Sequence, residues 1–78
     1  MKLEIISAQQ VLFSGEVTSA TLPGTMGEFT VLSNHASLLA TLSAGIVRYT
    51  DAAGADGSAE ITGGIADVDN NVISVCVY

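Results

Sequence analysis

Apolar and polar residues alternate along this chain in short runs, which is the two-residue period of β-strands. In the run Glu16–Leu22, the residues Thr18, Ala20 and Leu22 are expected on one face, and the odd-numbered residues, beginning with Val17, on the other. No stretch keeps the apolar period of a helix over about eleven residues, so no helix longer than one turn is expected. The predicted strands are Lys2–Ala8, Val11–Leu22, Glu28–Leu32, Leu38–Leu42, Ile46–Thr50, Ala59–Thr62, Gly64–Asp69 and Val72–Val77.

The second of these runs is long, and its sequence predicts two irregularities. Ser14-Gly15 is expected to form a bulge or bend, because glycine inside a strand pattern is typical of such positions. Pro23-Gly24 is expected to end the run, since proline cannot donate to a ladder. Thr25–Gly27 is then a loop, with positive φ expected at the glycines on either side of it.

Other turns follow from asparagine, aspartate and glycine. Asn70-Asn71 fits a two-residue type I′ turn, because asparagine tolerates positive φ. Asp51–Ser58 contains nothing large and is predicted to be a solvated hairpin loop. Gly63-Gly64 is either a simple turn or a place where another backbone approaches closely. The residues expected to form turns are Gly24, Asn34, Gly45, Gly63 and Gly64.

Short strands joined by tight turns indicate an all-β fold. We expect a small β-sandwich of about eight to ten short strands. The length of 78 residues predicts one domain, residues 1–78, with one core and little room for a deep pocket. Hydrophobic residues are 49% of the chain and charged residues 13%, so the chain is expected to fold and to have apolar surface covered by a partner.

The charge of the chain narrows its possible partners. Eight acidic residues against Lys2 and Arg48 give a net charge of −6. Nucleic acid and anionic lipid both attract clustered cations, which this chain lacks. No apolar run approaches the ~18–20 residues of a membrane span, and the N-terminus does not resemble a signal peptide, so no direct insertion into a bilayer is expected. A single Cys76 excludes an internal disulfide and favours a cytoplasmic location.

The chain offers few residues for catalysis or metal binding. A nucleophilic pair of Cys76 and His35 is disfavoured, because Cys76 is expected to pack as a small apolar residue in the last strand. No serine lies in a Gly-x-Ser-x-Gly elbow. Asp67–Asn71 lacks the glycine and closing glutamate of a calcium loop, and zinc would need more His or Cys ligands. We therefore expect no catalysis, no cofactor, no metal and no small-molecule substrate.

Two exposed positions keep alternative interpretations. Met26 and Glu28, on either side of Gly27, are either a loop tip of no consequence or a contact point for a partner. His35 either fixes its own turn or donates across an interface.

The segment Leu22–Leu39 reads LPGTMGEFTVLSNHASLL. It resembles the epsilon subunit of F-type ATP synthases, in which this stretch reads approximately L-P-G-x-x-G-E-x-x-[VI]-x-P-G-H-A-P-L-L. Ser33-Asn34 replaces Pro-Gly, and Ser37 replaces a proline. Asparagine can keep the left-handed turn, whereas Ser37 leaves the following segment less rigid in the unfolded chain. The flanking elements that agree are Ser7-Ala8 with Val11–Gly15, Ala44–Arg48, Gly63–Val68 and Asn71–Val75.

The resemblance implies an N-terminal β-sandwich without the C-terminal helical hairpin that usually follows it. If the chain is complete at Tyr78, the inhibition and ATP binding attributed to that hairpin are expected to be absent. The implied function is that of a non-catalytic central-stalk subunit, which links the gamma subunit to the membrane c-ring and couples proton flow to ATP synthesis. The implied location is peripheral, on the cytoplasmic face of the inner, energy-transducing membrane.

The resemblance also implies particular contact residues. Those implied for the c-ring are Thr25, Met26, Gly27 and Glu28, and those for the gamma subunit are Ser7 and His35. The alternative is an unrelated β-sandwich module that binds a peptide, protein or carbohydrate. It would require an aromatic-lined groove or an exposed sheet edge. With no tryptophan, the chain provides few aromatic side chains for carbohydrate stacking: Phe13, Phe29, Tyr49 and Tyr78.

Overall fold

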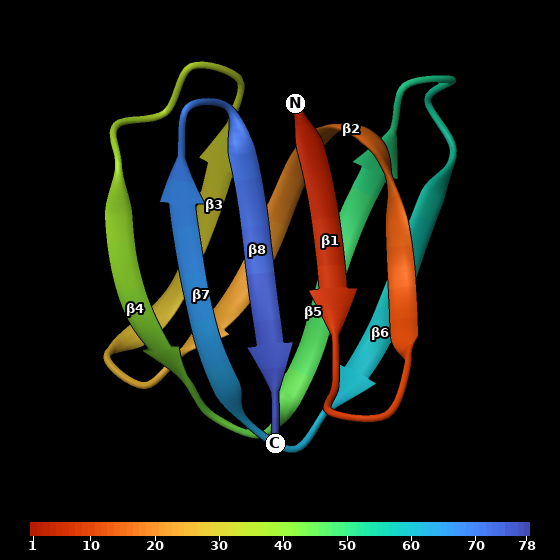
Figure 1. Ribbon diagram of the computed structural model, residues 1–78. Helices are drawn as coiled ribbons and strands as arrows, with labels where there is room; N and C mark the ends of the chain where they lie inside the picture. The colour runs from red at the N-terminus through yellow and green to blue at the C-terminus, as the bar shows by residue number, and fades with distance from the viewer.

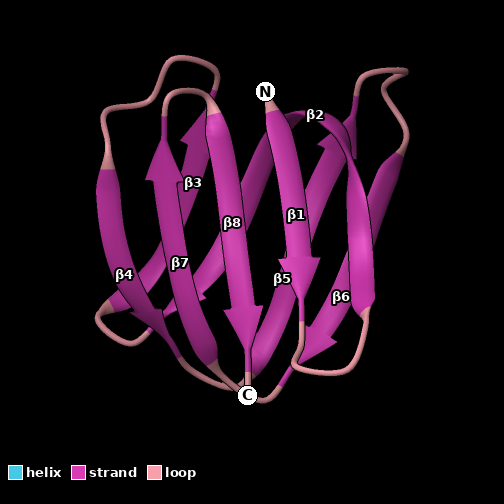
Figure 2. Ribbon diagram, viewed as in Figure 1, coloured by secondary structure: helices cyan, strands magenta, loops and turns pink.

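The computed structural model describes residues 1–78 and contains eight strands and no helix. Figure 2 shows strands joined only by loops and turns. It has no helix long and apolar enough to span a membrane. The strands are β1 (Lys2–Ile6), β2 (Val11–Gly24), β3 (Gly27–Leu32), β4 (Leu38–Leu42), β5 (Gly45–Asp51), β6 (Asp56–Ile61), β7 (Gly64–Asp69) and β8 (Val72–Val77).

The strands form two layers packed face to face (Figure 1). One layer has the order β4-β7-β8-β1, and the other contains β3, β5 and β6. The 14-residue strand β2 belongs to both, because its first part pairs with β1 and its second part pairs with β3 and β5. The predicted all-β sandwich is therefore confirmed.

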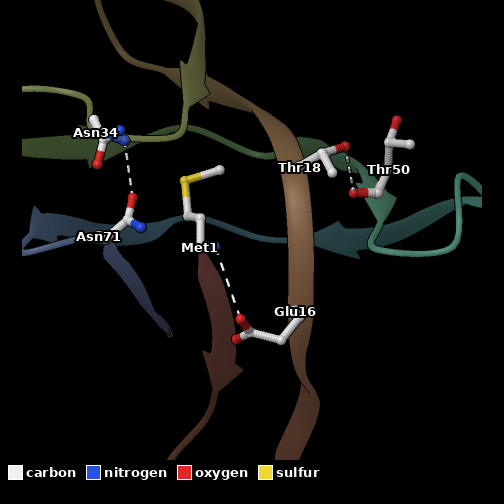
Figure 3. Close-up of polar contacts among 6 residues, drawn as sticks. All are labelled: Met1, Glu16, Thr18, Asn34, Thr50 and Asn71. Carbon is white, nitrogen blue, oxygen red and sulfur yellow. Dashed lines mark hydrogen bonds and ion pairs between the residues drawn. The ribbon is translucent and has the colours of Figure 1, made fainter.

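The irregularity in β2 does not lie where the sequence predicted it. Gly15 pairs in regular register with Leu3, so the bulge expected as one alternative at Ser14-Gly15 is wrong; the shift against β1 lies at Leu12, because Phe13 pairs with Ile5 and Val11 pairs with Ile6. The register against β5 shifts instead around Thr18, because Val17 pairs with Asp51 and Ser19 pairs with Thr50. The hydroxyl of the extra residue, Thr18, donates to the carbonyl of Thr50 at 3.4 Å (Figure 3).

This bulge changes which face each residue of β2 occupies. An extra residue reverses the alternation of side chains beyond it. Val17 is consequently buried together with Ala20 and Leu22, whereas Thr18 is exposed. The expectation that Val17 faces away from Ala20 and Leu22 is wrong for this reason.

The hairpin between β5 and β6 is tighter than predicted. Asp51 ends β5 and Asp56–Ser58 begin β6, so only residues 52–55 form the loop, where a longer Asp51–Ser58 loop was expected. The Asp51 carboxylate accepts the amides of Ala53 and Ala55 at 2.9 Å, which holds the short loop. The ring of Tyr49 covers Gly57, where an added Cβ would lie 2.5 Å from it. An aromatic ring over a glycine stabilises a strand that its composition disfavours.

Among the remaining turns, those at Asn34 and Asn70-Asn71 agree with the sequence, whereas Gly45 and Gly64, which were expected in turns, are the first residues of β5 and β7. Asn70 and Asn71 have φ of 51° and 66°, as a type I′ turn requires, and Asn34 has a φ of 64°. Both alternatives for Gly63-Gly64 hold. Gly63 has a φ of 140°, whereas Gly64 allows close approach, because an added Cβ would collide with the carbonyl oxygen of Cys76.

The core is entirely apolar and lies between the layers. No polar or charged side chain is buried. The turns and loops gather at two ends of the sandwich, which we call the Met26 end and the His35 end (Figure 1). The Met26 end carries the β1–β2 and β2–β3 turns and the C-terminus, and the His35 end carries the N-terminus and the β3–β4 and β7–β8 connections. The core residues are Leu3, Ile5, Val17, Ala20, Leu22, Val31, Leu42, Val47, Ile61, Ala66, Val68, Ile73 and Val75.

Candidate docking surfaces

The turn between β2 and β3 carries an exposed methionine. Thr25 and Met26 form a two-residue turn, and the Met26 side chain is fully exposed. Gly27 has a φ of 125°, as expected, but Gly24 does not have a positive φ. Glycine is instead required at position 24 because a side chain has no room there. An added Cβ on Gly24 would lie 2.6 Å from the carbonyl oxygen of Gly27 and 3.0 Å from the Phe29 ring.

Pro23 does not end the strand, contrary to the prediction. It pairs with Glu28 inside the β2–β3 ladder. Its carbonyl accepts the amide of Ser43 at 2.9 Å, so the backbone groups of Pro23 face away from β3. The missing N–H therefore costs the β2–β3 ladder no hydrogen bond. An added Cβ on Gly45 would lie 2.9 Å from the Pro23 ring, so Gly45 lets β5 begin beside the proline.

Two hydrogen bonds fasten the Met26 turn to β4. The amide of Thr25 donates to the carbonyl of Thr41 at 3.0 Å, and the two threonine hydroxyls lie 2.7 Å apart. The turn thus has a fixed direction although its tip is exposed. A shallow depression of about 540 Å³ lies beside it, lined by Gly24, Thr25, Met26, Gly27, Glu28, Phe29, Leu39, Ala40 and Thr41.

Glu28 is engaged in an ion pair that the sequence reasoning missed. Its Oε2 lies 3.2 Å from Nη1 of Arg48, and both side chains are 60% exposed. The pair spans β2, since Glu28 lies on β3 and Arg48 on β5. Only the register of three strands places them together, so the sequence contained no local signal for the contact.

The loop that holds His35 is braced by the β7–β8 turn. Asn71 Oδ1 accepts the amide of Asn34 at 2.9 Å (Figure 3), and Asp69 accepts the hydroxyl of Ser37 at 2.6 Å. His35 itself donates from Nδ1 to the carbonyl of Ala36 at 2.7 Å, so its ring helps to fix its own turn. The His35 side chain remains exposed, so Nε2 is free to meet a partner.

The N-terminus adds a second support at the same end. The carbonyl of Asn71 accepts the amide of Lys2, and the carbonyl of Met1 accepts the amide of Val17. The terminal amine of Met1 lies 3.8 Å from Glu16 (Figure 3). Asn71 therefore ties the His35 loop and β1 to one turn through two different atoms.

Ser7 fixes the β1–β2 turn at the opposite end. Its hydroxyl accepts the amides of Gln9 and Gln10 and donates to the carbonyl of Gln10, all at 3.3 Å. β1 consequently ends at Ile6, where the sequence predicted a strand through Ala8. The structure does not bring Ser7 and His35 together. Both border the layer β4-β7-β8-β1, because Ser7 follows β1 and His35 precedes β4.

An apolar row crosses the outer face of that layer. Ile65 pairs with Cys76, which pairs with Ile6, and Ile6 is paired in turn with Val11. Ile65 is 40% exposed and Val11 is 61% exposed. The neighbouring row toward the His35 end contains the carboxylates of Asp67 and Glu4. This outer face thus combines exposed apolar and acidic side chains.

Cys76 is exposed on this face, so the expectation that it packs as a small apolar residue is wrong. It lies on β8, whereas His35 lies in the loop at the opposite end, so the structure does not place the two as a nucleophile and a base. No three His, Cys, Asp or Glu side chains are grouped as metal ligands would be. The features that remain are stiff turns and partly apolar surfaces, which define a β-sandwich of the kind that docks to other proteins.

Comparison with known proteins then identifies the family. Residues 1–78 match the model of the ATP synthase delta/epsilon chain β-sandwich domain, and the chain belongs to this family. It is 43% identical over 70 residues to the ATP synthase epsilon chain of Chlorobium limicola, covering 90% of this chain and 80% of that one. It is 39% identical to the epsilon chain of Sulfurimonas denitrificans, over 99% of this chain and 59% of the relative.

Solved structures show the same fold. A chain in the structure of the Euglena gracilis mitochondrial ATP synthase, described as OSCP/F1/c-ring, matches with a TM-score of 0.88 and 25% identity over 96% of this chain and 48% of that chain. A chain of the Tetrahymena thermophila central stalk and c-ring matches with a TM-score of 0.78 and 17% identity over 99% of this chain and 62% of its own length, which shows the fold alone. The chain spans 50–80% of the length of the curated relatives it matches.

Proposed function

We propose that this chain is a non-catalytic central-stalk subunit of a proton-translocating ATP synthase, located at the membrane through that complex. The observation that supports this most is the match of residues 1–78 to the family's β-sandwich domain. The relatives that it resembles are named ATP synthase epsilon chains. We further propose that the domain lies on the cytoplasmic side of the membrane.

The Met26 end is proposed to contact the c-ring through Thr25, Met26, Gly27 and Glu28. The support is physical, because the turn combines an exposed apolar tip with two bonds from Thr25 to Thr41 that hold its direction. A rotor contact has to transmit force, so a tip that is fixed to a neighbouring strand suits it better than a loose loop. Glu28 contributes a charge beside this tip.

The gamma subunit is proposed to contact Ser7 and His35. Because these residues lie at opposite ends, a single contact that includes both has to extend along the sandwich. The outer face of β4-β7-β8-β1 lies between them and carries the exposed row of Ile65, Cys76 and Val11. Removal of apolar surface from water is favourable by about 25 cal/mol per Å², before the entropic costs of association are subtracted, so this row is suited to such a contact.

The mechanism that we propose is mechanical. The two layers share one apolar core, and the turns at both ends are braced by hydrogen bonds. A sandwich braced in this way can join the stalk to the ring, so that rotation of the ring is transmitted as torque. Several contacts have to share the load, because an exposed ion pair contributes only ~0.2–1 kcal/mol.

Co-expression with the gamma subunit of the same organism tests the assignment. We expect a stoichiometric complex, and in the assembled synthase we expect Glu28→Ala to weaken the coupling of ATP hydrolysis to proton pumping modestly. Insertion of four glycine and serine residues between Thr25 and Met26 should weaken it more, because the tip loses its fixed direction. Failure to form a complex, or normal proton pumping with the enlarged turn, would contradict the proposal.

A further inference from the structure

The strand β3 has an edge with no partner. It pairs with β2 along one side only, and no strand lies in register on its other side. The carbonyl of Pro23 points toward Ser43, away from β3. In an antiparallel pair, the backbone N–H and C=O groups of two opposite residues either all point toward the partner strand or all point away from it. The N–H and C=O of Glu28, the residue opposite Pro23, therefore point toward the free edge.

The same alternation applies further along β3. The backbone groups of Thr30 also point toward the free edge, and the carbonyl of Leu32 accepts the amide of His35 at 3.1 Å. Beyond that bond, none of the hydrogen bonds formed by turns and loops reaches the backbone of Glu28 or Thr30. These groups form a row of unpaired donors and acceptors on which another strand can pair.

Natural edge strands are protected by lysine, proline, bulges or charges that lie at the edge. β3 contains neither lysine nor proline, and its pairing with β2 is regular. Its one charged side chain, Glu28, is turned across β2 to Arg48 at 3.2 Å. The ion pair thus removes from the edge the group that would have blocked it.

The other edge strand of this layer is a useful contrast. β6 pairs only with β5, and its exposed residues include Asp56 and Glu60. The carbonyl of Thr50 on β5 points toward Thr18 on β2 and therefore away from β6. The backbone N–H and C=O of Asp56, which is opposite Thr50, consequently point to the free edge of β6, and those of Ser58, two residues further along, do the same. β6 therefore has a free edge as well, but Glu60 lies beside it without a bonded partner, whereas the Asp56 carboxylate accepts the hydroxyl of Thr50 at 3.0 Å.

Apolar surface accompanies the free edge of β3. Leu32 is 57% exposed, and Leu39 on the facing strand β4 is 74% exposed. The depression of about 540 Å³ lies between these strands and includes Phe29 and Met26. A second copy of this chain is a poor occupant, because each copy has a net charge of −6 and the two would repel.

We infer that the free edge of β3 receives an extended segment of the gamma subunit as an added strand. The inference rests on the proposed function, because it adds a second contact of the gamma subunit to the one proposed for the outer face of β4-β7-β8-β1. Continuity supports this occupant: β3 runs directly into the loop of His35, the proposed gamma contact, through the bond between Leu32 and His35. Backbone pairing supplies the affinity in such a mode, and the exposed Leu32 and Leu39 supply apolar contacts.

Hydrogen exchange of the wild-type chain, alone and bound to gamma, tests the inference without any substitution. Alone, the amides of Glu28 and Thr30 should exchange rapidly, whereas those of Phe29 and Val31, which face β2, should be protected. In the complex, the amides of Glu28 and Thr30 should slow by at least about a hundredfold, as expected for amides that enter a ladder. The amide of Ser58 on the edge of β6 should not change.

Three variants extend this test. Thr30→Pro removes an edge N–H without removing a bond to β2, and should weaken the complex by roughly tenfold or more. Thr30→Val removes only the hydroxyl, which lies 2.9 Å from that of Thr21, and should leave the affinity unchanged. Ser58→Pro places proline at the matched position of the β6 edge and should also leave it unchanged. Melting temperatures of the free variants establish that each one folds.

The outcomes separate the two proposals. If the complex forms but Glu28 and Thr30 continue to exchange rapidly, the added strand is refuted and the proposed function stands. If no complex forms with gamma, both are refuted. If the two amides are already protected in the free chain in a manner that increases with protein concentration, a second copy occupies the edge, and the inference is refuted.

Discussion

Individual glycines in this chain meet different physical requirements. Gly27 and Gly63 have positive φ, where other residues are strained, whereas Gly64 and Gly24 have ordinary backbone conformations but no space for a Cβ. The sequence pattern predicted the positive φ of Gly27 but not the crowding at Gly24. Such patterns do not distinguish strain from crowding, because crowding depends on a strand that is remote in sequence.

Gly64→Ala should destabilise the fold through crowding. The added methyl would meet the backbone of Cys76 and Val77, which cannot rotate away, so we expect a loss of about 1–3 kcal/mol. Urea denaturation measures it. Gly15→Ala is the control, since its methyl meets only the end of the Phe13 ring, at 3.2 Å. Equal stabilities of the two variants would contradict this explanation.

The ion pair of Glu28 and Arg48 should contribute little to stability. Both side chains are largely exposed, so a double-mutant cycle with Glu28→Gln and Arg48→Gln should yield a coupling of at most ~1 kcal/mol that declines with added salt. A coupling well above this value, insensitive to salt, would show that the pair is shielded in solution.

At the scale of elements, local pattern predicted most strands, and pairing corrected their limits. β1, β3 and β8 lie within about two residues of expectation, as is usual for boundaries read from a pattern. β2 continues through Pro23 because the carbonyl of Pro23 accepts the amide of Ser43, in the connection between β4 and β5. β6 begins at Asp56 because the ring of Tyr49 covers Gly57. Neither effect has a local signal, since each depends on a residue from another strand.

The His35 loop is an element held by distant side chains of the β7–β8 turn, and Asn71 is one of them. Asn71→Gly keeps the positive φ that its turn requires but removes the acceptor for the amide of Asn34. We expect the overall stability to change by at most ~1 kcal/mol, while the amide of Asn34 exchanges several-fold faster. Two-dimensional NMR measures both.

The control for this prediction is Asn70→Gly, at the other positive-φ position of the same turn. Its side chain makes no hydrogen bond to the His35 loop, so Asn34 should exchange at the wild-type rate. Equal acceleration of exchange in the two variants would mean that turn flexibility, rather than the bond from Asn34 to Asn71, sets the order of the loop.

At the scale of the whole molecule, charge opposes self-association while apolar patches favour it. The net charge is −6 at pH 7, and Met26, Leu32 and Leu39 are strongly exposed. Repulsion between like-charged copies disappears near the isoelectric point. The Met26 end and the free edge of β3 are both proposed to dock to partners. These two surfaces are therefore the ones that should cause the free domain to associate.

Light scattering as a function of pH tests this balance. The chain should be monomeric at pH 7 and should associate near pH 4.1, its isoelectric point. Met26→Ser together with Leu39→Ser should reduce association at pH 4.1 without changing the calculated charge. If the double variant associates as strongly as the wild type, other surfaces are responsible.

The sequence by itself determined the all-β class, the position of most strands, the turn at Asn70-Asn71 and the family resemblance, because these depend on residues that are close together in the chain. Only the tertiary structure decided that Val17 faces the core, that Arg48 holds Glu28 and that Asn71 braces the loop of His35. It also decided that Ser7 and His35 lie at opposite ends and that β3 keeps a free edge. The reason is that register and strand order set these contacts, and both are properties of the assembled sheet rather than of any segment.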